Sequence, residues 1–202
     1  MHIVKIPKWF QSLFNSIEWR VKTDKKVIYL TFDDGPNIDS TEFIISSLEK
    51  YHAKATFFCL GSNILKYPEQ FKKINKSKFS IGNHTFQHMN GWKTKTKIYL
   101  NDVKKCHEIY SSNLFRPPFG KINPFLIDEL KKTHRIIMWD INSWDFDPSI
   151  NKELIFNKMV KKIQNGSIVL FHDNKKSLEN LRYLLPKVLS YFSEKGYKFE
   201  KL

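Results

Sequence analysis

Cysteine is nearly absent from this chain. Its two cysteines, Cys59 and Cys106, stand far apart and form no metal-binding or redox motif, so a disulfide framework is excluded. Cys59 lies in an apolar run and Cys106 on a helical pattern. Both are therefore expected to be buried free thiols.

Long apolar runs are absent as well. No stretch approaches the about 20 apolar residues needed to span a bilayer. Charges and Pro7 interrupt the N-terminal residues, where a secretory signal needs an unbroken apolar run. The compartment stays open, and these absences favour a cytoplasmic or peripheral membrane location.

Acidic residues are few: 20 against 34 basic residues leave a net charge of +14. The lysines are scattered in twos, whereas nucleic-acid-binding proteins more often cluster Arg and Lys on one element with interleaved aromatics. We therefore expect no nucleic acid as a partner. The charge favours an anionic polymer or a membrane surface as neighbour.

Apolar residues are sufficient for one core, since the chain has 202 residues and is 41% hydrophobic. Strand-like runs alternate with helical patterns, which predicts an α/β protein with parallel strands covered on both faces. The predicted helices are 40–51, 68–75, 95–111, 124–132, 150–164 and 178–193. The predicted strands are 27–31, 55–60, 79–82, 114–116, 135–140, 167–172 and 197–201.

Residues 1–24 are expected to form an N-terminal amphipathic segment packed on a domain of residues 25–202. Apolar side chains recur at helical spacing over 7–19, which predicts a short helix. Such a helix could lie on a membrane. Packing against the domain explains the same stripe, and we favour it.

Polar side chains follow the ends of five predicted strands. In a parallel barrel these ends open on one face, where active sites form. Five clusters at one end argue for an active site more strongly than any single motif. The residues are Asp33, Asp34, His84, His88, Arg116, Asp145 and His172.

Asp34, His84 and His88 have the residue types of a metal site. Two imidazoles four positions apart can reach one ion from a single helical turn, and a carboxylate completes three ligands. A bound metal lowers the pKa of water towards about 7, so Asp33 can take the remaining proton. The alternative, a plain polar turn at Asp33-Asp34-Gly35, would place two carboxylates side by side without a compensating cation.

Two further clusters complete the expected chemistry. Arg116 can hold Asp33 ionised, and the turn after it can present the N–H of Phe119 to an oxyanion. His172 can protonate a leaving amine, and the stretch 139–146 offers a carboxylate to orient it and aromatic walls for a sugar. The alternatives are an ordinary Pro-Pro turn with a surface arginine and a core histidine.

Residues 25–200 closely resemble the polysaccharide deacetylases of carbohydrate esterase family four, the NodB-homology domain, because five motifs occur in the family's order. The resemblance implies a bacterial-type catalytic domain over 25–202, built as a distorted (β/α) barrel of about seven parallel strands. It also implies one divalent metal ion. Zinc is expected first, with cobalt, nickel or manganese as alternatives.

The resemblance carries residue roles with it. Asp33 is implied as base, Asp34 as ligand, His172 as acid and Leu170 as part of the acetyl pocket. Phe119 stands where the family usually has Tyr.

The fourth motif departs from the family, which usually has Trp directly after Asp. Here Phe146 follows Asp145, and Trp144 precedes it. Asp145 is implied as the partner of His172, with Asp140 as the alternative.

A metal-dependent hydrolase that removes N-acetyl groups from a peptidoglycan-like or chitin-like polymer or oligomer is the leading expectation. A deformylase or deacylase of a lipid-linked sugar is the alternative. A non-catalytic module that binds anionic glycans is less favoured, because the site looks complete. We expect a monomer with a carbohydrate partner and an optional peripheral membrane contact.

Overall fold

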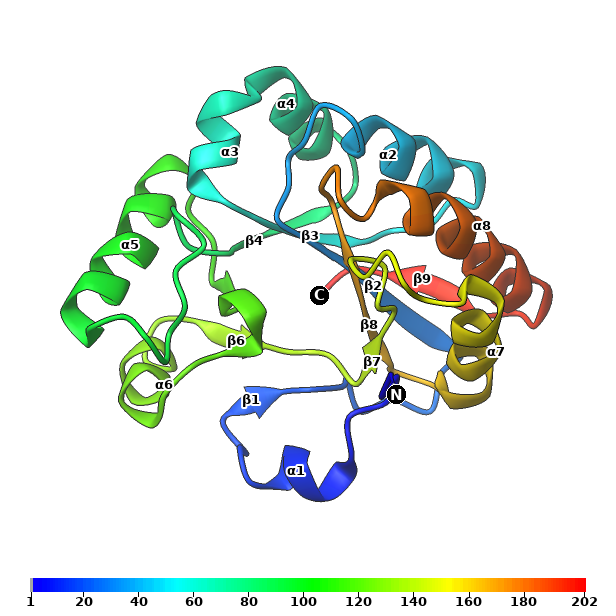
Figure 1. The fold of residues 1–202 in the computed structure, drawn as a ribbon, viewed down its shortest axis with the longest axis horizontal. Coiled ribbons are helices and arrows are strands. Elements are labelled where there is room, and N and C mark those ends of the chain that lie inside the picture. The colour runs from blue at the N-terminus through cyan, green and yellow to red at the C-terminus, as the bar shows by residue number, and fades with distance from the viewer. Residues whose placement is uncertain (1) are drawn as a thin grey trace.

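The structure, a computed structural model, describes residues 2–202. Within that range nine strands form one parallel sheet, curled into a half-barrel with helices outside it (Figure 1). This confirms the expected α/β barrel and all seven predicted strands. The strands are β1 (Ile17–Glu18), β2 (Val27–Asp33), β3 (Thr56–Cys59), β4 (Ser80–Asn83), β5 (Leu114–Phe115), β6 (Arg135–Ile137), β7 (Ile141–Asn142), β8 (Ile168–His172) and β9 (Lys198–Glu200).

The six predicted helices are present, and two start at an asparagine cap. The Asn123 side chain accepts a hydrogen bond from the Leu126 N–H, and Asn151 accepts one from Leu154, so each satisfies an N-terminal amide. The helices are α1 (Lys8–Ser12), α2 (Thr41–Lys50), α3 (Gly61–Lys66), α4 (Pro68–Lys76), α5 (Thr96–Ile109), α6 (Pro124–Leu130), α7 (Lys152–Lys162) and α8 (Leu178–Glu194). A 3₁₀ turn, η1, covers Pro118–Gly120.

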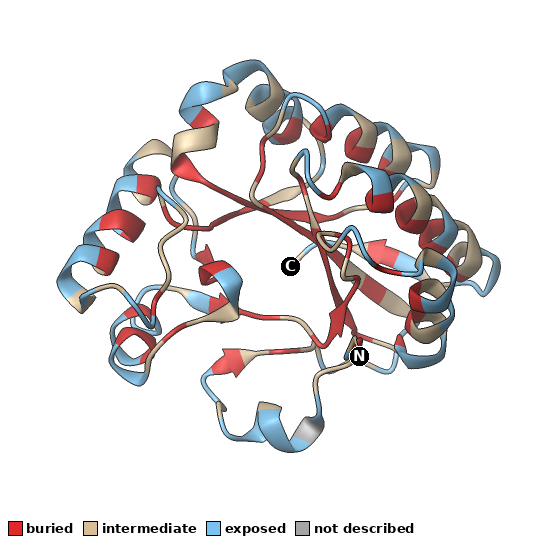
Figure 2. Cartoon of the chain, viewed as in Figure 1, coloured by how far each residue is buried: buried red, intermediate tan, exposed pale blue. Residues whose placement is uncertain are grey.

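The core lies between the sheet and the outer helices, as the red strands of Figure 2 show. Phe32 of β2 stacks on Phe57 and Phe171 of the neighbouring strands, with ring centroids 5.2 and 5.9 Å apart. Cys59 and Cys106 are buried free thiols, as expected. This packing anchors β2, whose last residue begins the polar site.

The run 135–140, predicted as one strand, is a strand only as far as Ile137, and a separate strand, β7, follows at Ile141 with different neighbours. β6 pairs with β5, whereas β7 pairs with β8 from the other end of the sheet order. Four Cα steps separate Ile137 from Ile141, a span of at most about 15 Å. This short link forces the two ends of the sheet towards each other and curls the barrel.

The N-terminal segment lies along both of these edges. Ile6 donates a hydrogen bond to the Asp140 carbonyl, Asn142 donates one to Val4, and β1 pairs with β6. The helix predicted over 7–19 covers only Lys8–Ser12, because the chain turns after it to form β1. Met1, the first residue of the expected segment 1–24, lies outside the described residues.

Among residues 2–202, no helix combines the length and apolar character that crossing a bilayer requires.

Candidate active site

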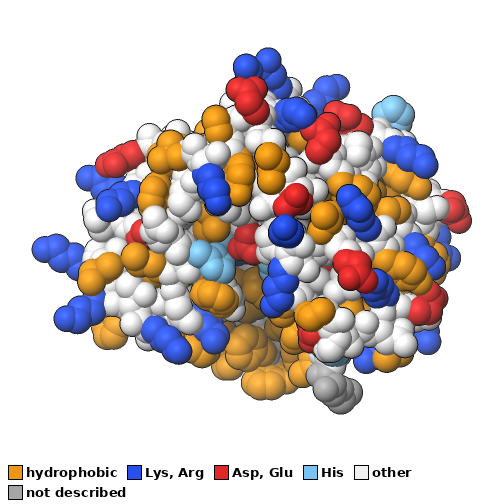
Figure 3. Space-filling model, turned by 45° about the horizontal axis from the view of Figure 1, so that its top comes forward, with side chains coloured by type: hydrophobic (Ala, Val, Ile, Leu, Met, Phe, Trp, Pro, Cys, Tyr) orange, Lys and Arg blue, Asp and Glu red, His pale blue; other side chains and the backbone are white. Residues whose placement is uncertain are grey.

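A cavity of about 560 Å³ opens at the carboxyl ends of the strands. In Figure 3 it appears as a hollow with a histidine at its rim and hydrophobic side chains below. Arg116 and Asp145 are fully buried behind its wall. The predicted residues that line it are Asp33, Asp34, His84, His88, Phe119, Trp144, Leu170 and His172.

Asp33 is the last residue of β2, and Asp34 turns the chain away with a positive φ of 76°. The next residue must be glycine, since a Cβ on Gly35 would lie 2.2 Å from Oδ2 of Asp173. That carboxylate is fixed by hydrogen bonds of 2.6 Å from Ser40 and from Thr41. The backbone around Asp34 is therefore determined by its surroundings.

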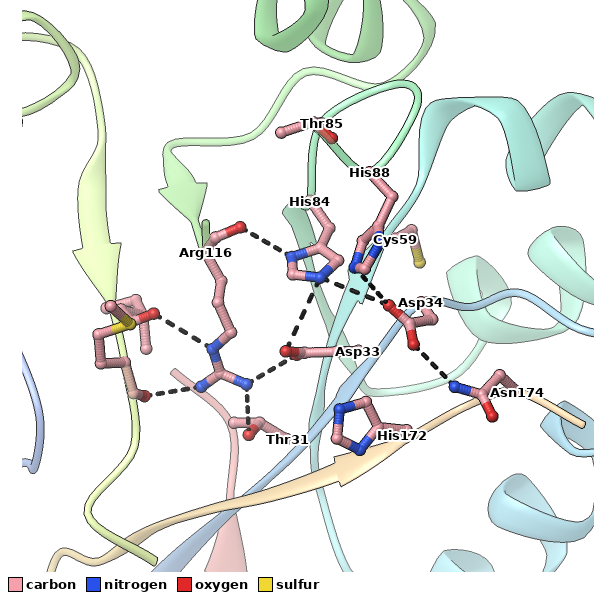
Figure 4. Close-up of polar contacts among 12 residues, drawn as sticks. Thr31, Asp33, Asp34, Cys59, His84, Thr85, His88, Arg116, His172 and Asn174 are labelled. Carbon is pink, nitrogen blue, oxygen red and sulfur yellow. Dashed lines mark hydrogen bonds and ion pairs between the residues drawn. The ribbon is translucent and has the colours of Figure 1, made fainter. Parts of the chain in front are cut away.

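Asp34, His84 and His88 converge on one point (Figure 4). Oδ1 of Asp34 lies 3.5 Å from Nε2 of His84 and 3.1 Å from Nε2 of His88. Two ligand atoms about 2.1 Å from one tetrahedral ion would lie about 3.4 Å apart. Oδ1 is buried without a hydrogen-bond partner among the described residues, whereas Oδ2 accepts from Asn174. The three side chains therefore fit a metal ion.

Electrostatics favour the charged form of the Asp34 carboxyl. Burial alone would raise the pKa of Asp34, but the imidazoles of His84 and His88, together with the charge of His172, outweigh it. The pKa consequently lies well below its usual value. An ionised carboxylate is the form that binds a cation.

The two histidines lie on the loop that follows β4. Thr85 and His88 have positive φ angles of 69° and 56°. The loop is held from α5, where Oδ2 of Asp102 accepts hydrogen bonds of 2.9 Å from the amides of Phe86 and Gln87. Sequence reasoning missed Asp102, although a carboxylate within the apolar stripe of a predicted helix was a visible signal.

The tautomer of His84 is set by a neighbouring strand. Nδ1 lies 2.7 Å from the carbonyl oxygen of Arg116, so it donates its proton there and leaves Nε2 free to bind an ion. The Arg116 backbone thus orients a candidate ligand, in addition to the role of its side chain.

Arg116 is not the surface residue of the alternative interpretation, because its side chain is fully buried. One terminal nitrogen donates to Oδ1 of Asp33 over 2.8 Å and to Thr31 over 2.7 Å. The other nitrogens donate to the carbonyls of Ile137 and Met138. Burial lowers the pKa of Arg116, and the Asp33 carboxylate opposes that change. Asp33 is thereby held as the partner of a fixed cation.

His172 is partnered by Asp145. Its Nδ1 lies 2.8 Å from Oδ1 of Asp145, and its backbone N–H donates to Oδ2 over 2.8 Å. Asp140 instead accepts hydrogen bonds from Ser167 and Ile168, so it is not the partner. Burial would lower the pKa of His172, but the Asp145 carboxylate outweighs it and raises the pKa to about 9.

Aromatic and aliphatic side chains form the walls of the cavity. Phe119 has a φ of 60° and packs its ring 4.4 Å from His88, whereas Leu170 is buried at the base. Trp144 also has a positive φ, and its Nε1 donates to the Ile3 carbonyl. Positive φ at several site residues is typical of functional loops that their surroundings hold in place. Sequence reasoning assigned no role to four lining residues: Lys121, Asn142, Asn174 and Lys176.

The sequence profile of one family, Polysaccharide deacetylase, matches residues 20–135, more than half of the chain. The chain belongs to this family. The expected resemblance is thereby confirmed, and with it an enzyme that acts on amide bonds of a carbohydrate.

Two curated relatives are similar to this polysaccharide deacetylase over most of its length. A peptidoglycan-N-acetylglucosamine deacetylase of Bacillus cereus is 33% identical over 193 residues, covering 91% of this chain and 89% of the relative. The peptidoglycan-N-acetylmuramic acid deacetylase PdaC of Bacillus subtilis is 35% identical over 162 residues. That match covers 77% of this chain and 34% of PdaC.

A solved structure of the family agrees closely with this one. A peptidoglycan N-acetylglucosamine deacetylase in complex with 4-naphthalen-1-yl-N-oxidanyl-benzamide superimposes with a TM-score of 0.88 at 29% sequence identity. The superposition covers 98% of this polysaccharide deacetylase and 95% of the other chain. The whole described domain, including its N-terminal segment, therefore follows the family's fold.

Proposed function

We propose that this polysaccharide deacetylase removes N-acetyl groups from the amino sugars of a peptidoglycan-like polymer and depends on one divalent metal ion. The observation that carries the proposal is the convergence of His84 and His88 on the unsatisfied carboxylate oxygen of Asp34. The names of the relatives, which act on N-acetylglucosamine and N-acetylmuramic acid in peptidoglycan, support this polymer as the substrate.

Asp34, His84 and His88 would hold the ion. One carboxylate and two imidazoles suit zinc, with cobalt, nickel or manganese as alternatives. When bound, the ion supplies Lewis-acid polarisation of the amide carbonyl and makes a water molecule more acidic. This donor set leaves coordination positions for water and substrate.

The remaining steps belong to the chain's own residues. Asp33, which accepts a hydrogen bond from Arg116, takes a proton from the attacking water, whose oxygen adds to the acetyl carbon. The N–H of Phe119 stabilises the oxyanion, since the amides of Gly120 and Lys121 already donate within the turn. The C–N bond then breaks to release acetate.

The leaving nitrogen takes its proton from His172. Asp145 binds Nδ1 of this ring, so Nε2 is the nitrogen that serves the substrate. A pKa of about 9 keeps the ring protonated at neutral pH, as an acid requires. Leu170 packs against the acetyl methyl group, and Trp144 forms a wall against the sugar.

A substrate panel tests this proposal. Metal-loaded protein is incubated with peptidoglycan, N-acetylglucosamine oligomers and N-formylated counterparts, and acetate and formate are quantified. We expect acetate from the N-acetylated glycans. Absence of acetate from every glycan, with metal bound, would contradict the proposal.

A second candidate substrate, an acylated sugar linked to a lipid, is favoured by one observation. Trp9 and Leu13 of the N-terminal segment are exposed by 69% and 66%, which suits contact with lipid. Trp9→Ser with Leu13→Ser should then lower binding to vesicles and turnover of the lipid-linked sugar alone. Leu154→Ser on α7, exposed by 51%, is the matched control.

A further inference from the structure

Two lysines of the cavity mouth have no role in the chemistry proposed above. Lys121 follows the η1 turn on the His88 side, and Lys176 follows β8 on the His172 side. Among residues 2–202, neither ammonium group forms an ion pair with a carboxylate. A lysine without an ion pair is common on a solvated surface. These two lysines differ from such surface residues because both line the same cavity, from the ends of different strands.

Each of these lysines lies over an aromatic ring. Nζ of Lys121 is 5.7 Å from the ring centroid of Trp92, and Nζ of Lys176 is 5.8 Å from that of Phe146. Phe146 also lines the cavity. A cation beside an aromatic face provides both a flat apolar surface for a sugar ring and a positive charge for an acidic substituent.

Trp92 is 65% exposed, yet a hydrogen bond holds its indole in place. Its Nε1 donates to the Ile122 carbonyl over 3.0 Å, and the Gly91 amide donates to the Lys121 carbonyl over 3.2 Å. A Cβ on Gly91 would lie 2.5 Å from that carbonyl oxygen, so only glycine allows this close approach. The indole is therefore presented to solvent in a fixed orientation beside the mouth.

The two carboxylates deeper in the cavity do not neutralise the positive charge of the lysines, because each has other partners. Asp33 is bound to the Arg116 guanidinium, and Asp34 faces two imidazoles. The mouth therefore carries positive charge that attracts an anion. Figure 3 shows basic side chains near the hollow.

We propose that this mouth selects N-acetylated glycans that carry a carboxylate close to the reacting acetamido group. Lys121 and Lys176 bind the carboxylate, and Trp92 stacks against a neighbouring sugar of the polymer. This inference rests on the proposed function and adds to it the chemical class of the substrate. Neutral oligomers of N-acetylglucosamine would be poorer substrates because they offer no anion.

The test compares one glycan in two forms. An oligomer of N-acetylglucosamine and N-acetylmuramic acid is used with its lactyl carboxylates free or converted to amides, so the acetyl groups are identical. The preference is the ratio of kcat/KM for the free form to that for the amidated form. For the unaltered protein at low salt, two exposed charge contacts should give a preference of about fivefold, which salt should reduce.

Lys121→Gln with Lys176→Gln should bring this preference close to one through a higher KM for the free acid. Lys93→Gln with Lys175→Gln is the control, since these exposed neighbours remove the same charge and do not line the cavity. An equal kcat/KM for both forms in the unaltered protein, or an unchanged preference in the cavity variant, would overturn the inference. Absence of acetate from both forms would instead overturn the proposed function itself.

Trp92→Ala provides an independent readout. It should raise KM for a tetrasaccharide more than for a disaccharide, because only the longer glycan reaches the indole. Phe125→Ala, at a side chain that is 75% exposed and does not line the cavity, is the control. Equal effects of Trp92→Ala on both lengths would exclude the stacking role.

Discussion

The two sides of the cavity are held in different ways. On the Arg116 side, which comprises Asp33, His84 and Arg116, the side chains are buried at or just after the ends of sheet strands. Two of them, His84 and Arg116, bind backbone carbonyls, and Arg116 also binds Asp33. On the His172 side, which comprises Trp144, Asp145 and His172, one carboxylate holds the imidazole, and the N-terminal segment holds the indole.

This difference indicates that the two sides of the cavity have different roles. The Arg116 side is over-determined by strand pairing and buried hydrogen bonds, so its geometry cannot adapt without loss of stability. On the His172 side, Trp144 and Asp145 lie on the loop after β7, and His172 ends β8. The Trp144 indole takes its support from Ile3 in the N-terminal segment. We expect changes on the first side to affect chemistry and folding, and changes on the second to affect the acid and the substrate fit.

The largest effect is expected at the base. Asp33→Asn preserves shape but cannot accept the proton, so kcat should fall by about 10³-fold to 10⁴-fold while metal content stays the same. Asp39→Asn, at an exposed carboxylate of the following loop, should leave kcat unchanged. Steady-state acetate release measures kcat, and elemental analysis measures the metal content. A base role for Asp33 would be abandoned if Asp33→Asn kept near-normal kcat.

Arg116→Gln should be the most destabilising change on the same side. It leaves the Asp33 charge buried without its partner, which costs about 3–5 kcal/mol of unfolding free energy. Arg135→Gln breaks an ion pair with Glu18 whose side chains are 44% and 39% exposed, so it should cost about 1 kcal/mol or less. Urea denaturation measures both. Equal costs would contradict the contrast between a buried and a surface arginine.

Asp145→Asn tests the His172 side through pH. The acid works while protonated, so activity should fall as pH rises through the pKa of His172, which the Asp145 charge raises to about 9. Without that charge the pKa decreases, and the alkaline limb of kcat should move to lower pH. Asp147→Asn is the control, because Asp147 binds His2 and not His172. An alkaline limb unmoved by Asp145→Asn would exclude this pairing as the source of the acid.

The smallest effect is expected at His2. Its ring packs edge-on against Trp144 at 4.8 Å and binds Asp147, so His2→Ala removes one support of the cavity wall. KM should rise by about threefold, as expected for the loss of one aromatic contact, with kcat little changed. A change confined to kcat would contradict this, because it would show that the N-terminal segment acts on the acid, His172, and not on the cavity wall at Trp144.

Much of the fold could be predicted from local patterns. The seven strands lie in apolar runs, and the helices show clear periodicity with caps such as Asn123. The sequence patterns did not predict β1 and β7, because a strand of two residues is too short to show an alternation of apolar and polar side chains. The prediction of a helix over 7–19 was wrong beyond Ser12, because the strand pairing of Ile17 with Ile136 outweighs the local helical pattern.

The site could be located from the sequence because parallel strands bring their carboxyl ends to one face. Strand order and spacing are enough to place Asp33, Asp34, Arg116 and His172 together at that face. They could not supply partners that depend on tertiary contacts, such as Asn174 on Asp34 or Ile3 on Trp144.

The central claim, a metal-dependent deacetylation built on Asp34, His84 and His88, is tested most directly by titrating zinc into chelator-treated protein. Bound metal and acetate release from peptidoglycan are measured together in the unaltered protein and in Asp34→Ala with His84→Ala. We predict activity that rises in proportion to metal and saturates at one ion per chain, with at least about a thousandfold loss in the double variant. Acetate release that survives chelation, or that persists in the double variant, would contradict the account.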